Sequence, residues 1–353
     1  MDEGALLERL VRRYSPSGRE GAAVHEFARI GRELGYSVRT DAVGNGIARR
    51  GRGRPRVVFL GHIDTVEGRL PVRRRAGRLH GRGTVDAKGP LAAALLAGAD
   101  LAGPGEYVVV AAVGEETDSR GARHLLPYVR PDAVIAGEPS GWDGVTIGYK
   151  GELQLERTFR GKRTHYSSPF PTATDRAVEW VGAVRSFVAE RTRESPFRSL
   201  TAKVVEFAGQ RDGDHETARV TVDLRLPPGM TTRDLLRDLP PAAGAAAPVV
   251  RVRVEPIEVD RSNPVAVSLL DGIRAAGGRP TVWRKGGTSD LNLVLPVWNA
   301  PGVAYGPGEA RLDHTDRESV SLAELSRSVA VLNFALRRLR SGGLTPRRSG
   351  AGA

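Results

Sequence analysis

The sequence predicts an α/β protein into which a smaller α+β unit has been inserted. The beginning of the chain alternates helical spacing of apolar residues with short unbroken apolar runs, a pattern typical of parallel strands that are buried on both faces. Between residues 151 and 256 the order changes to strand, helix, strand, strand, helix, strand, which is that of a ferredoxin-like unit. The α/β pattern then resumes.

Two helices, three buried strands and a third helix are expected in the first part of the chain. The helical spacing and the apolar runs predict helices over 6–14 and 24–34 and strands over 57–60, 107–113 and 133–136. Pro90 is suited to the first turn of a helix over 91–101, because the first turn does not use the N–H that proline lacks.

The inserted unit and the last part of the chain have equally clear patterns. The inserted unit is expected to contain a strand over 153–159, a helix over 175–191, strands over 200–207 and 218–226, a helix over 231–239 and a strand over 249–259. Alternating apolar residues at 220–226 and 250–254 indicate a sheet with one covered face. The α/β pattern returns with a helix over 264–276, strands near 280–283 and 302–305, and a helix over 322–339.

These patterns divide the chain into domains. Residues 1–150 and 257–340 form one discontinuous domain, because His314 belongs with motifs near the N-terminus, and residues 151–256 form the inserted domain. Residues 341–353 are rich in Gly, Ser and Arg and are expected to be disordered.

Composition excludes several classes of function. The 353 residues include no cysteine, so any metal must be held by histidines and carboxylates. The formal net charge of +12 suggests a nucleic-acid ligand, but the basic residues are scattered, aromatic residues make up only 5% and no nucleic-acid-binding motif is present. No stretch is apolar enough to span a membrane and no signal peptide is recognisable, so the expected location is the cytoplasm.

Histidine and acidic side chains follow the predicted parallel strands. His62 follows the first, Glu115 and Glu116 follow the second, and Glu138 follows the third. Because the carboxyl ends of parallel strands meet at one edge of a sheet, these side chains are expected to converge. A hydrolytic metal centre needs such a set of imidazoles and carboxylates with one position left for water.

Each residue also has an ordinary explanation. A lone His-x-Asp is usually a hydrogen-bonded surface pair, two glutamates after a strand usually form a solvated loop, and Asp86 could cap the following helix. Glu138 before a proline could belong to a turn. The joint occurrence of suitable groups at several strand ends favours a metal site.

The motifs resemble those of a known family in order and spacing. They are His62-x-Asp64, Gly83-x-x-Asp86-x-Lys88-Gly89, Gly114-Glu115-Glu116, Gly137-Glu138-Pro139-Ser140, the segment 286–290 and His314. This set resembles the M20 metallopeptidases and deacylases, which include acetylornithine deacetylase and succinyl-diaminopimelate desuccinylase. The resemblance covers residues 5–340 and implies a zinc aminopeptidase-like catalytic domain interrupted by a ferredoxin-like dimerisation domain that acts as a lid.

The resemblance implies a centre with two divalent metal ions. Asp86 would bridge the two ions, His62 and Glu138 would complete one site, and Glu116 and His314 would complete the other. All these ligands offer nitrogen or oxygen, so Zn²⁺ is the first choice, with Co²⁺ or Mn²⁺ as replacements.

Two further acidic residues have implied roles at this centre. Asp64 would orient His62, as carboxylate partners of metal-bound imidazoles do. Glu115 would be the general base that takes a proton from the attacking water and delivers it to the departing amine.

The inserted domain is implied to contribute to substrate binding in a homodimer. His165 would reach the neighbouring site as an oxyanion donor, and Arg225 would bind a substrate carboxylate. Gly287, Thr288 and Ser289 would line the substrate pocket, where small residues permit close approach. Alternatively, His165 is a surface histidine beside a turn and Arg225 a solvent-facing strand residue.

Residues 85–91, 137–142 and 146–151 also resemble one branch of the family, the hydrolases that release lysine or ornithine from a small acidic amino-group carrier protein. That reaction cleaves the amide between the γ-carboxylate of the carrier's C-terminal glutamate and the α-amine of the amino acid, the last step of lysine and sometimes arginine biosynthesis. A basic enzyme suits an acidic carrier. Glu67 departs from the pattern, because many relatives have proline there.

Two alternatives remain at this point. Another M20 activity, such as an acetylornithine deacetylase or a dipeptidase, would use the same centre on a small free substrate. A basic binding protein with a degenerate site would have lost metal ligands, whereas every expected ligand is present.

Overall fold

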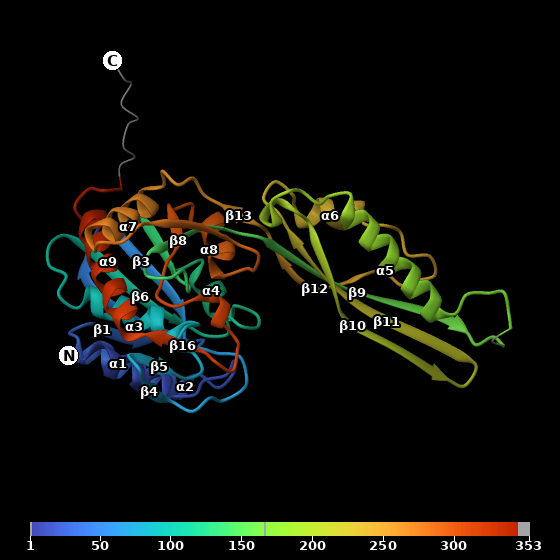
Figure 1. The fold of residues 1–353 in the computed structure, drawn as a ribbon, viewed down its shortest axis with the longest axis horizontal. Helices are drawn as coiled ribbons and strands as arrows, with labels where there is room; N and C mark the ends of the chain where they lie inside the picture. The colour runs from blue at the N-terminus through green and yellow to red at the C-terminus, as the bar shows by residue number, and fades with distance from the viewer. Residues whose placement is uncertain (1, 166, 345–353) are drawn as a thin grey trace, which may run out of the picture. The chain divides into compact units, whose positions relative to one another are not determined.

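The computed structural model describes residues 2–165 and 167–344. These residues divide into two compact units (Figure 1). The first unit contains residues 2–147, 259–283 and 289–344, and the second unit contains residues 148–258 and 284–288. Residues 284–288, which the sequence placed in the catalytic domain, therefore group with the second unit.

A mixed sheet forms the centre of the first unit. Its strands follow the order β1-β2-β6-β3-β7-β15-β8. Their bounds are β1 (Ser37–Thr40), β2 (Gly46–Arg52), β6 (Gly105–Ala112), β3 (Arg56–His62), β7 (Ala133–Gly137), β15 (Gly302–Ala304) and β8 (Gly144–Tyr149). Strands β6, β3, β7 and β15 are parallel, which confirms the prediction of parallel strands, whereas β1, β2 and β8 pair antiparallel.

Helices cover this sheet. They are α1 (Glu3–Val11), α2 (Gly21–Glu33), α3 (Lys88–Gly98), α4 (Arg120–Leu125), α7 (Pro264–Ala275), α8 (Asp290–Trp298), α9 (Leu322–Arg340) and the short 3₁₀ helix η2 (Ala310–Leu312). Val57 and Phe59 of β3 share one core with Leu91 of α3 and Leu332 of α9. The alternating residues Val58 and Leu60 are also buried, so β3 is covered on both faces. A small sheet with the order β16-β5-β4 contains β16 (Ser319–Ser321), β5 (Arg78–His80) and β4 (Arg73–Arg75).

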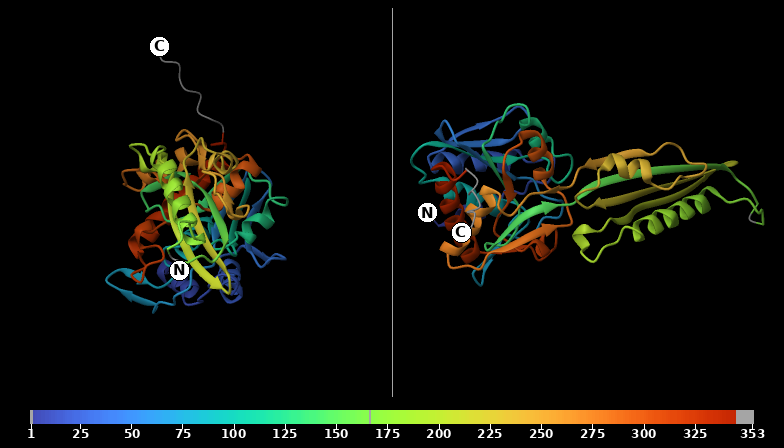
Figure 2. Two further views of the ribbon diagram at one scale, coloured as in Figure 1. Left: turned by 90° about the vertical axis from the view of Figure 1, so that its right-hand side faces the viewer. Right: turned by 90° about the horizontal axis from the view of Figure 1, so that it is seen from above.

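The second unit is a four-stranded antiparallel sheet with helices. The strand order is β10-β11-β9-β12, and helix α5 runs along one face of the sheet (Figure 2). The elements are β9 (Gly151–Lys162), α5 (Ala173–Ala189), η1 (Pro196–Arg198), β10 (Thr201–Asp212), β11 (His215–Leu226), α6 (Thr232–Asp238) and β12 (Val249–Val254). Thr172 caps α5, and Trp180 of that helix packs in the core of the unit with Phe159. The strand and helix order is the one predicted.

One predicted strand is wrong in detail. The strand expected over 249–259 is interrupted, because β12 ends at Val254 and β13 (Ile257–Glu258) begins after Pro256. Proline has no N–H to donate to a ladder, so it separates the two strands. Val249 and Val250 are 47% and 40% exposed, so this part of the sheet lacks the covered face that was expected. Strands β13 and β14 (Thr281–Lys285) both pair with β8.

The end of the described chain is a turn. Residues 341–344 follow α9, and Leu344 packs against the core of the first unit. The rest of the tail predicted from residue 341 lies outside the described residues. No helix among the residues that the structure describes is long and apolar enough to cross a membrane.

Candidate active site

The predicted strand ends share one edge of the sheet. In the register of the parallel strands, His62 at the end of β3 lies beside Ala112 of β6, and Gly61 lies beside Gly137 of β7. Glu115, Glu116 and Glu138 follow directly on these strands. Gly114 has a positive φ of 75°, a conformation that favours glycine and that turns the chain after β6. The strand ends that carry the predicted residues therefore meet at one edge of the sheet.

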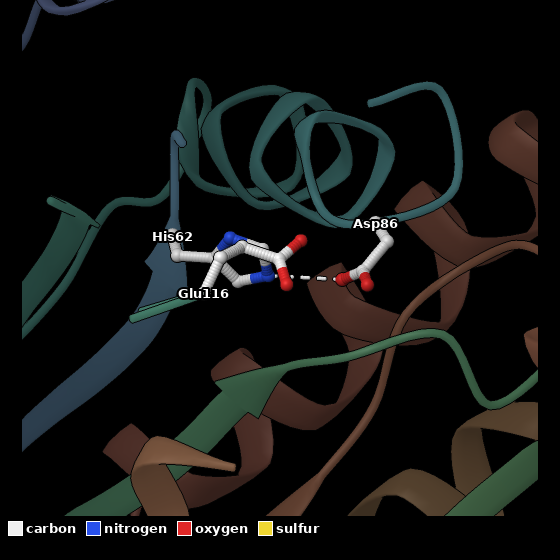
Figure 3. Close-up of side chains that lie close together, drawn as sticks. All are labelled: His62, Asp86 and Glu116. Carbon is white, nitrogen blue, oxygen red and sulfur yellow. Dashed lines mark hydrogen bonds and ion pairs between the residues drawn. The ribbon is translucent and has the colours of Figure 1, made fainter. Parts of the chain in front are cut away.

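Three expected ligands lie close together at this edge. His62, Asp86 and Glu116 each offer a ligand atom, and these atoms lie within 4.8 Å of one another (Figure 3). His62 Nε2 is 2.9 Å from Oδ1 of Asp86. Burial opposes protonation of His62, but Glu115, Asp64 and Asp86 together raise its pKa well above the ordinary value. The carboxylates around His62 thus stabilise the protonated form of its imidazole.

His314 completes the cluster from the far end of the sequence. Its Nε2 is 3.1 Å from Oδ2 of Asp86 and 3.1 Å from Oε1 of Glu116. The residue has a φ of 60°, so a left-handed backbone turns the ring towards these carboxylates. Hydrogen bonds to Asp86 and Glu116 raise the pKa of His314 to about 10.

Asp86 lies between the two imidazoles. One carboxylate oxygen faces His62 and the other faces His314, which is the arrangement that a bridging ligand needs. The two histidines and their acidic neighbours offer nitrogen and oxygen donors only, a set that fits Zn²⁺, Co²⁺ or Mn²⁺. The peptide bond after Asp86 is cis. The residues present therefore fit a centre for divalent ions.

Asp64 supports the cluster from within the protein. Its carboxylate accepts hydrogen bonds from Ser17 Oγ at 2.7 Å and from the backbone N–H groups of Glu115 and Glu116 at 3.1 Å. Its backbone oxygen is 3.1 Å from Nδ1 of His62. Burial would raise the pKa of Asp64, but His62 and these donors lower it. The lowered pKa favours the ionised form of Asp64. Its hydrogen bonds connect the end of β3, which carries His62, to the loop that carries Glu115 and Glu116.

Glu115 is a half-buried carboxylate among other acids. Burial raises its pKa well above the ordinary value, and the charges of Glu138, Asp290 and Asp86 raise it further, while His62 opposes this. Glu138, at the end of β7, thus acts electrostatically on Glu115. A carboxylate with a raised pKa is suited to accept and return a proton near neutral pH.

Sequence reasoning missed Glu318. This buried carboxylate accepts hydrogen bonds from the backbone N–H groups of Gly83, Val85 and Asp86 at 2.9, 3.0 and 3.2 Å. Its other oxygen accepts a hydrogen bond from Arg82 at 2.9 Å. Glu318 therefore fixes the loop that carries Asp86. The position of Glu318, four residues after His314, could have indicated that it lies near the metal site. An acidic residue in a polar segment usually faces solvent, however, so the position alone did not predict this role.

Asp290 was also missed as a site residue, although it stands in a quoted motif. It is the first residue of α8 and is buried, and its Oδ1 has no hydrogen-bond partner among the described residues. Burial raises the pKa of Asp290 to about 6, with a contribution from Asp64, while Ser119, His62 and Arg123 oppose this. Asp290 thus adds to the acidic surroundings of Glu115.

The expected residues of the inserted domain lie in the second unit. His165 is exposed, and its Nδ1 is 2.7 Å from Ser167 Oγ. Arg225 is held by two carboxylates, with Nη1 3.0 Å from Glu152 and Nε 2.8 Å from Asp223. The guanidinium that was expected to bind a substrate carboxylate therefore already has acidic partners within its own unit.

The expected substrate loop is divided between the two units. Gly287 has nothing within 4 Å of where a Cβ would stand and no left-handed φ, so neither packing nor backbone conformation requires glycine there. Thr288 Oγ1 is 3.5 Å from Glu152. Ser289, in the first unit, is buried, and its hydroxyl caps α8. The Ser289 side chain therefore has a structural role.

Comparison with known proteins identifies the family. Residues 58–338 match the peptidase family M20/M25/M40. The chain belongs to this family. It is a hydrolase of a metallopeptidase family, and divalent metal use is implied by that membership and by the cluster of His62, Asp86 and Glu116.

Relatives of similar length within the M20 family share more than a third of their residues with this chain. A protein of Pyrococcus horikoshii, provisionally named LysW-lysine/LysW-ornithine hydrolase, is 38% identical over 96% of this chain and 97% of its own. The LysW-lysine hydrolase of Deinococcus radiodurans is 36% identical over 96% of this chain and 97% of its own. The names of these two proteins indicate that they hydrolyse lysine or ornithine from LysW.

Solved structures support the fold of this M20 chain. Aminopeptidase PepT of Bacillus cereus has a TM-score of 0.80 and 18% identity, covering 96% of this chain and 98% of its own. The M20 metallo-carboxypeptidase Sso-CP2 of Sulfolobus solfataricus has a TM-score of 0.80 and 15% identity, covering 97% and 100%. At these identities the likeness establishes the M20 metallopeptidase fold and its mixed α/β sheets.

Proposed function

We propose that this chain hydrolyses the amide that joins lysine or ornithine to the carrier protein LysW. The observation that carries the proposal is Asp86, whose two oxygens face two different histidines at the sheet edge that also carries Glu115. Relatives that share more than a third of their residues over nearly the full chain have names that describe this reaction. The chemistry is amide hydrolysis with release of a free amino acid.

Two divalent ions, Zn²⁺ first, are proposed for the centre. Asp86 would contribute to both sites, His62 and Glu138 to one, and Glu116 and His314 to the other. Support comes from the ligand atoms within 4.8 Å of one another and from the two 3.1 Å contacts of His314. Such ions supply Lewis acidity, which polarises an amide carbonyl and makes water more acidic.

Glu115 is the proposed proton carrier. It would take the proton of the attacking water and give it to the amine that leaves, so the amino acid departs with a neutral α-amine before it is protonated by solvent. The raised pKa of Glu115, caused by burial and by Glu138, Asp290 and Asp86, supports this role because the proton must be both accepted and returned. Asp64 would keep His62 in place throughout.

The second unit is proposed to mediate a homodimer and to supply His165 to the site of the partner. Support comes from β10, an edge strand of twelve residues that is exposed along most of its length, with Val205 and Phe207 54% and 42% exposed. An exposed edge strand with apolar side chains offers unpaired backbone groups that can pair with a strand of another chain. Arg225 and Gly287 would then face the substrate.

The net positive charge of this chain supports the proposal that an acidic LysW is its partner. A chain with a net charge of +12 attracts an acidic protein over distances longer than direct contact. The cytoplasm, where amino-acid biosynthesis takes place, is the location that this reaction implies.

The test is a comparison of substrates. Purified protein with Zn²⁺ or Co²⁺ is incubated with LysW carrying γ-linked lysine, with LysW carrying γ-linked ornithine and with N-acetylornithine, and the products are measured by mass spectrometry. The expected result is release of lysine or ornithine from LysW and slow or no cleavage of N-acetylornithine. Efficient cleavage of N-acetylornithine without cleavage of either LysW conjugate would replace the proposal with a small-substrate deacylase.

A further inference from the structure

A cavity of about 150 Å³ lies in the first unit, outside the residues assigned to the metal centre. Its polar lining consists of Arg12, Tyr14, Arg69 and Arg82, which we call the arginine pocket. Val11, Leu70 and Val72 provide apolar lining. Nothing in the proposed reaction uses these residues.

Arg82 is a fixed donor of the arginine pocket. It is only 8% exposed, and its Nε and Nη1 donate to the backbone oxygens of Gly68 and Thr315 at 3.1 and 3.0 Å. Nη1 also donates to Glu318 at 2.9 Å. Its Nη2 makes no hydrogen bond within the described residues and is free to donate to a ligand. Because Thr315 follows His314, Arg82 also connects the pocket to the segment beside the metal centre.

The other polar groups of the pocket are donors as well. Tyr14 Oη accepts a hydrogen bond from the backbone N–H of Gly68 at 3.1 Å, so its own proton remains to be donated. Arg12 donates to Glu8 through Nε and Nη2 at 3.0 and 2.6 Å, which leaves Nη1. Arg69 is exposed and has no carboxylate partner within the described part of the chain.

Charge and hydrogen bonding therefore both select an anion. Glu8 and Glu318 offset two of the three guanidinium groups, which leaves the charge of Arg69 uncompensated. Guanidinium forks match carboxylates in geometry. The apolar lining fits the methylene groups of an aspartate or glutamate side chain better than a fully hydrated inorganic anion.

We propose that the arginine pocket binds a carboxylate side chain of the acidic carrier protein whose conjugate the enzyme cleaves. This inference rests on the proposed function and deepens it, because it assigns a contact that a small substrate cannot make. The pocket would hold the body of the carrier while its C-terminal amide lies at the metal centre. Its effect should appear in binding of the carrier and should be absent from the chemical step.

The test uses Arg69→Gln and Arg12→Gln, with Arg73→Gln as the matched control. Arg73 is exposed on β4 and lies outside the pocket, and Arg82 is left unchanged because it bonds Glu318. Two substrates are compared: the carrier with γ-linked lysine, and γ-glutamyl-lysine, which contains the same amide without the carrier. Calorimetry with the lysine-free carrier gives a second measurement that does not depend on turnover.

Both pocket variants should raise KM for the carrier conjugate roughly three- to tenfold, with kcat unchanged. They should weaken binding of the lysine-free carrier by a similar factor and leave γ-glutamyl-lysine unaffected. The salt dependence of KM should also become shallower, because screening acts on the charge that was removed. Arg73→Gln should behave as the wild type.

Two results would overturn the inference and leave the proposed function intact. One is an unchanged KM and carrier affinity in both variants while the wild type cleaves the conjugate. The other is an equal loss with both substrates, since the pocket would then act on the metal centre. If the wild type cleaves no carrier conjugate at all, the proposed function fails and the inference falls with it.

Discussion

The two histidines that contact Asp86 have very different surroundings. His62 ends a strand that is buried on both faces and is 2% exposed, and its second ring nitrogen faces the backbone oxygen of Asp64. The His314 side chain lies on a left-handed loop and is 50% exposed. The His62 half of the centre is therefore fixed before an ion binds, whereas the His314 half is open to solvent.

This difference suggests a division of labour. Preorganised ligands lose less conformational entropy when an ion binds, so the ion at His62 is expected to be held more tightly. The open half would give substrate and solvent access to the second of the two proposed ions. Each of the following variants changes the His62 half, the His314 half or a residue that serves both of them.

The largest effect is expected for Glu115→Gln, which removes the proposed proton carrier. kcat should fall about 10²- to 10⁴-fold, since general bases contribute that much. Both ions should remain, as measured by elemental analysis, because Glu115 is not an expected ligand. Glu116→Ala is the matched variant and should lose metal as well as activity. Full activity in Glu115→Gln, or full metal content in Glu116→Ala, contradicts the assigned roles.

Glu318→Ala tests whether Glu318 supports the loop that carries Asp86, the residue between the two halves. It leaves three backbone N–H groups and Arg82 without their buried acceptor, and loss of one partner of a buried ion pair destabilises by about 3–5 kcal/mol. Urea denaturation of chelator-treated protein measures this change. Asp316→Ala, at a nearby exposed acid, should be almost neutral. If the two variants are equally stable, Glu318 does not fix the Asp86 loop.

Asp64→Asn should affect the His62 half more than the His314 half, because Asp64 supports His62 and reaches Glu116 only through a backbone N–H. Loss of a group that orients a metal-bound histidine weakens metal affinity about 10- to 100-fold. Competition with a chromogenic chelator should therefore show one strongly weakened ion and one less affected ion. Equal weakening of both ions would mean that the halves are not independent. Ser17→Ala, which removes one hydrogen bond to Asp64, should produce the same effect on a smaller scale.

The smallest effect concerns pH and the His314 half. The pKa of His314 is raised from 6.5 to about 10 by Asp86 and Glu116, so the folded protein binds its proton more tightly than the unfolded chain. The stability that this proton contributes is fully present below pH 6.5 and is lost as the pH rises towards 10.

Thermal denaturation of chelator-treated protein measures this dependence. Tm should fall between pH 6.5 and pH 10, and less steeply in His314→Gln. Metal affinity should rise over the same range because binding releases the proton. A pH dependence that is identical in His314→Gln and the wild type would exclude His314 as its source.

Much of this architecture could be predicted from the sequence. The buried runs before His62, Glu115 and Glu138 are apolar throughout, and this pattern is typical of parallel strands. Strands β2 and β4 were missed, because arginine-rich segments such as GIARRGR carry no unbroken apolar run. Their positions depend on pairing with neighbours that no local pattern specifies.

The site was predictable where chemistry and position coincide. His62, Asp86, Glu116 and His314 were expected as ligands, and the structure brings them together. Glu318 could not be found in this way, because its role depends on hydrogen bonds to a loop more than two hundred residues away in sequence. The roles of His165 and Arg225 remain predictions, since they depend on a dimer and a bound substrate.

The contacts of Glu318 have a consequence for the order in which this part of the protein can fold during synthesis. The loop that presents Asp86 is fixed by a residue that is synthesised more than two hundred residues later, and His314 precedes that residue by only four positions. A nascent chain therefore contains His62 and Glu116 long before Glu318 and His314 exist. The described cluster cannot form until those two residues have been made.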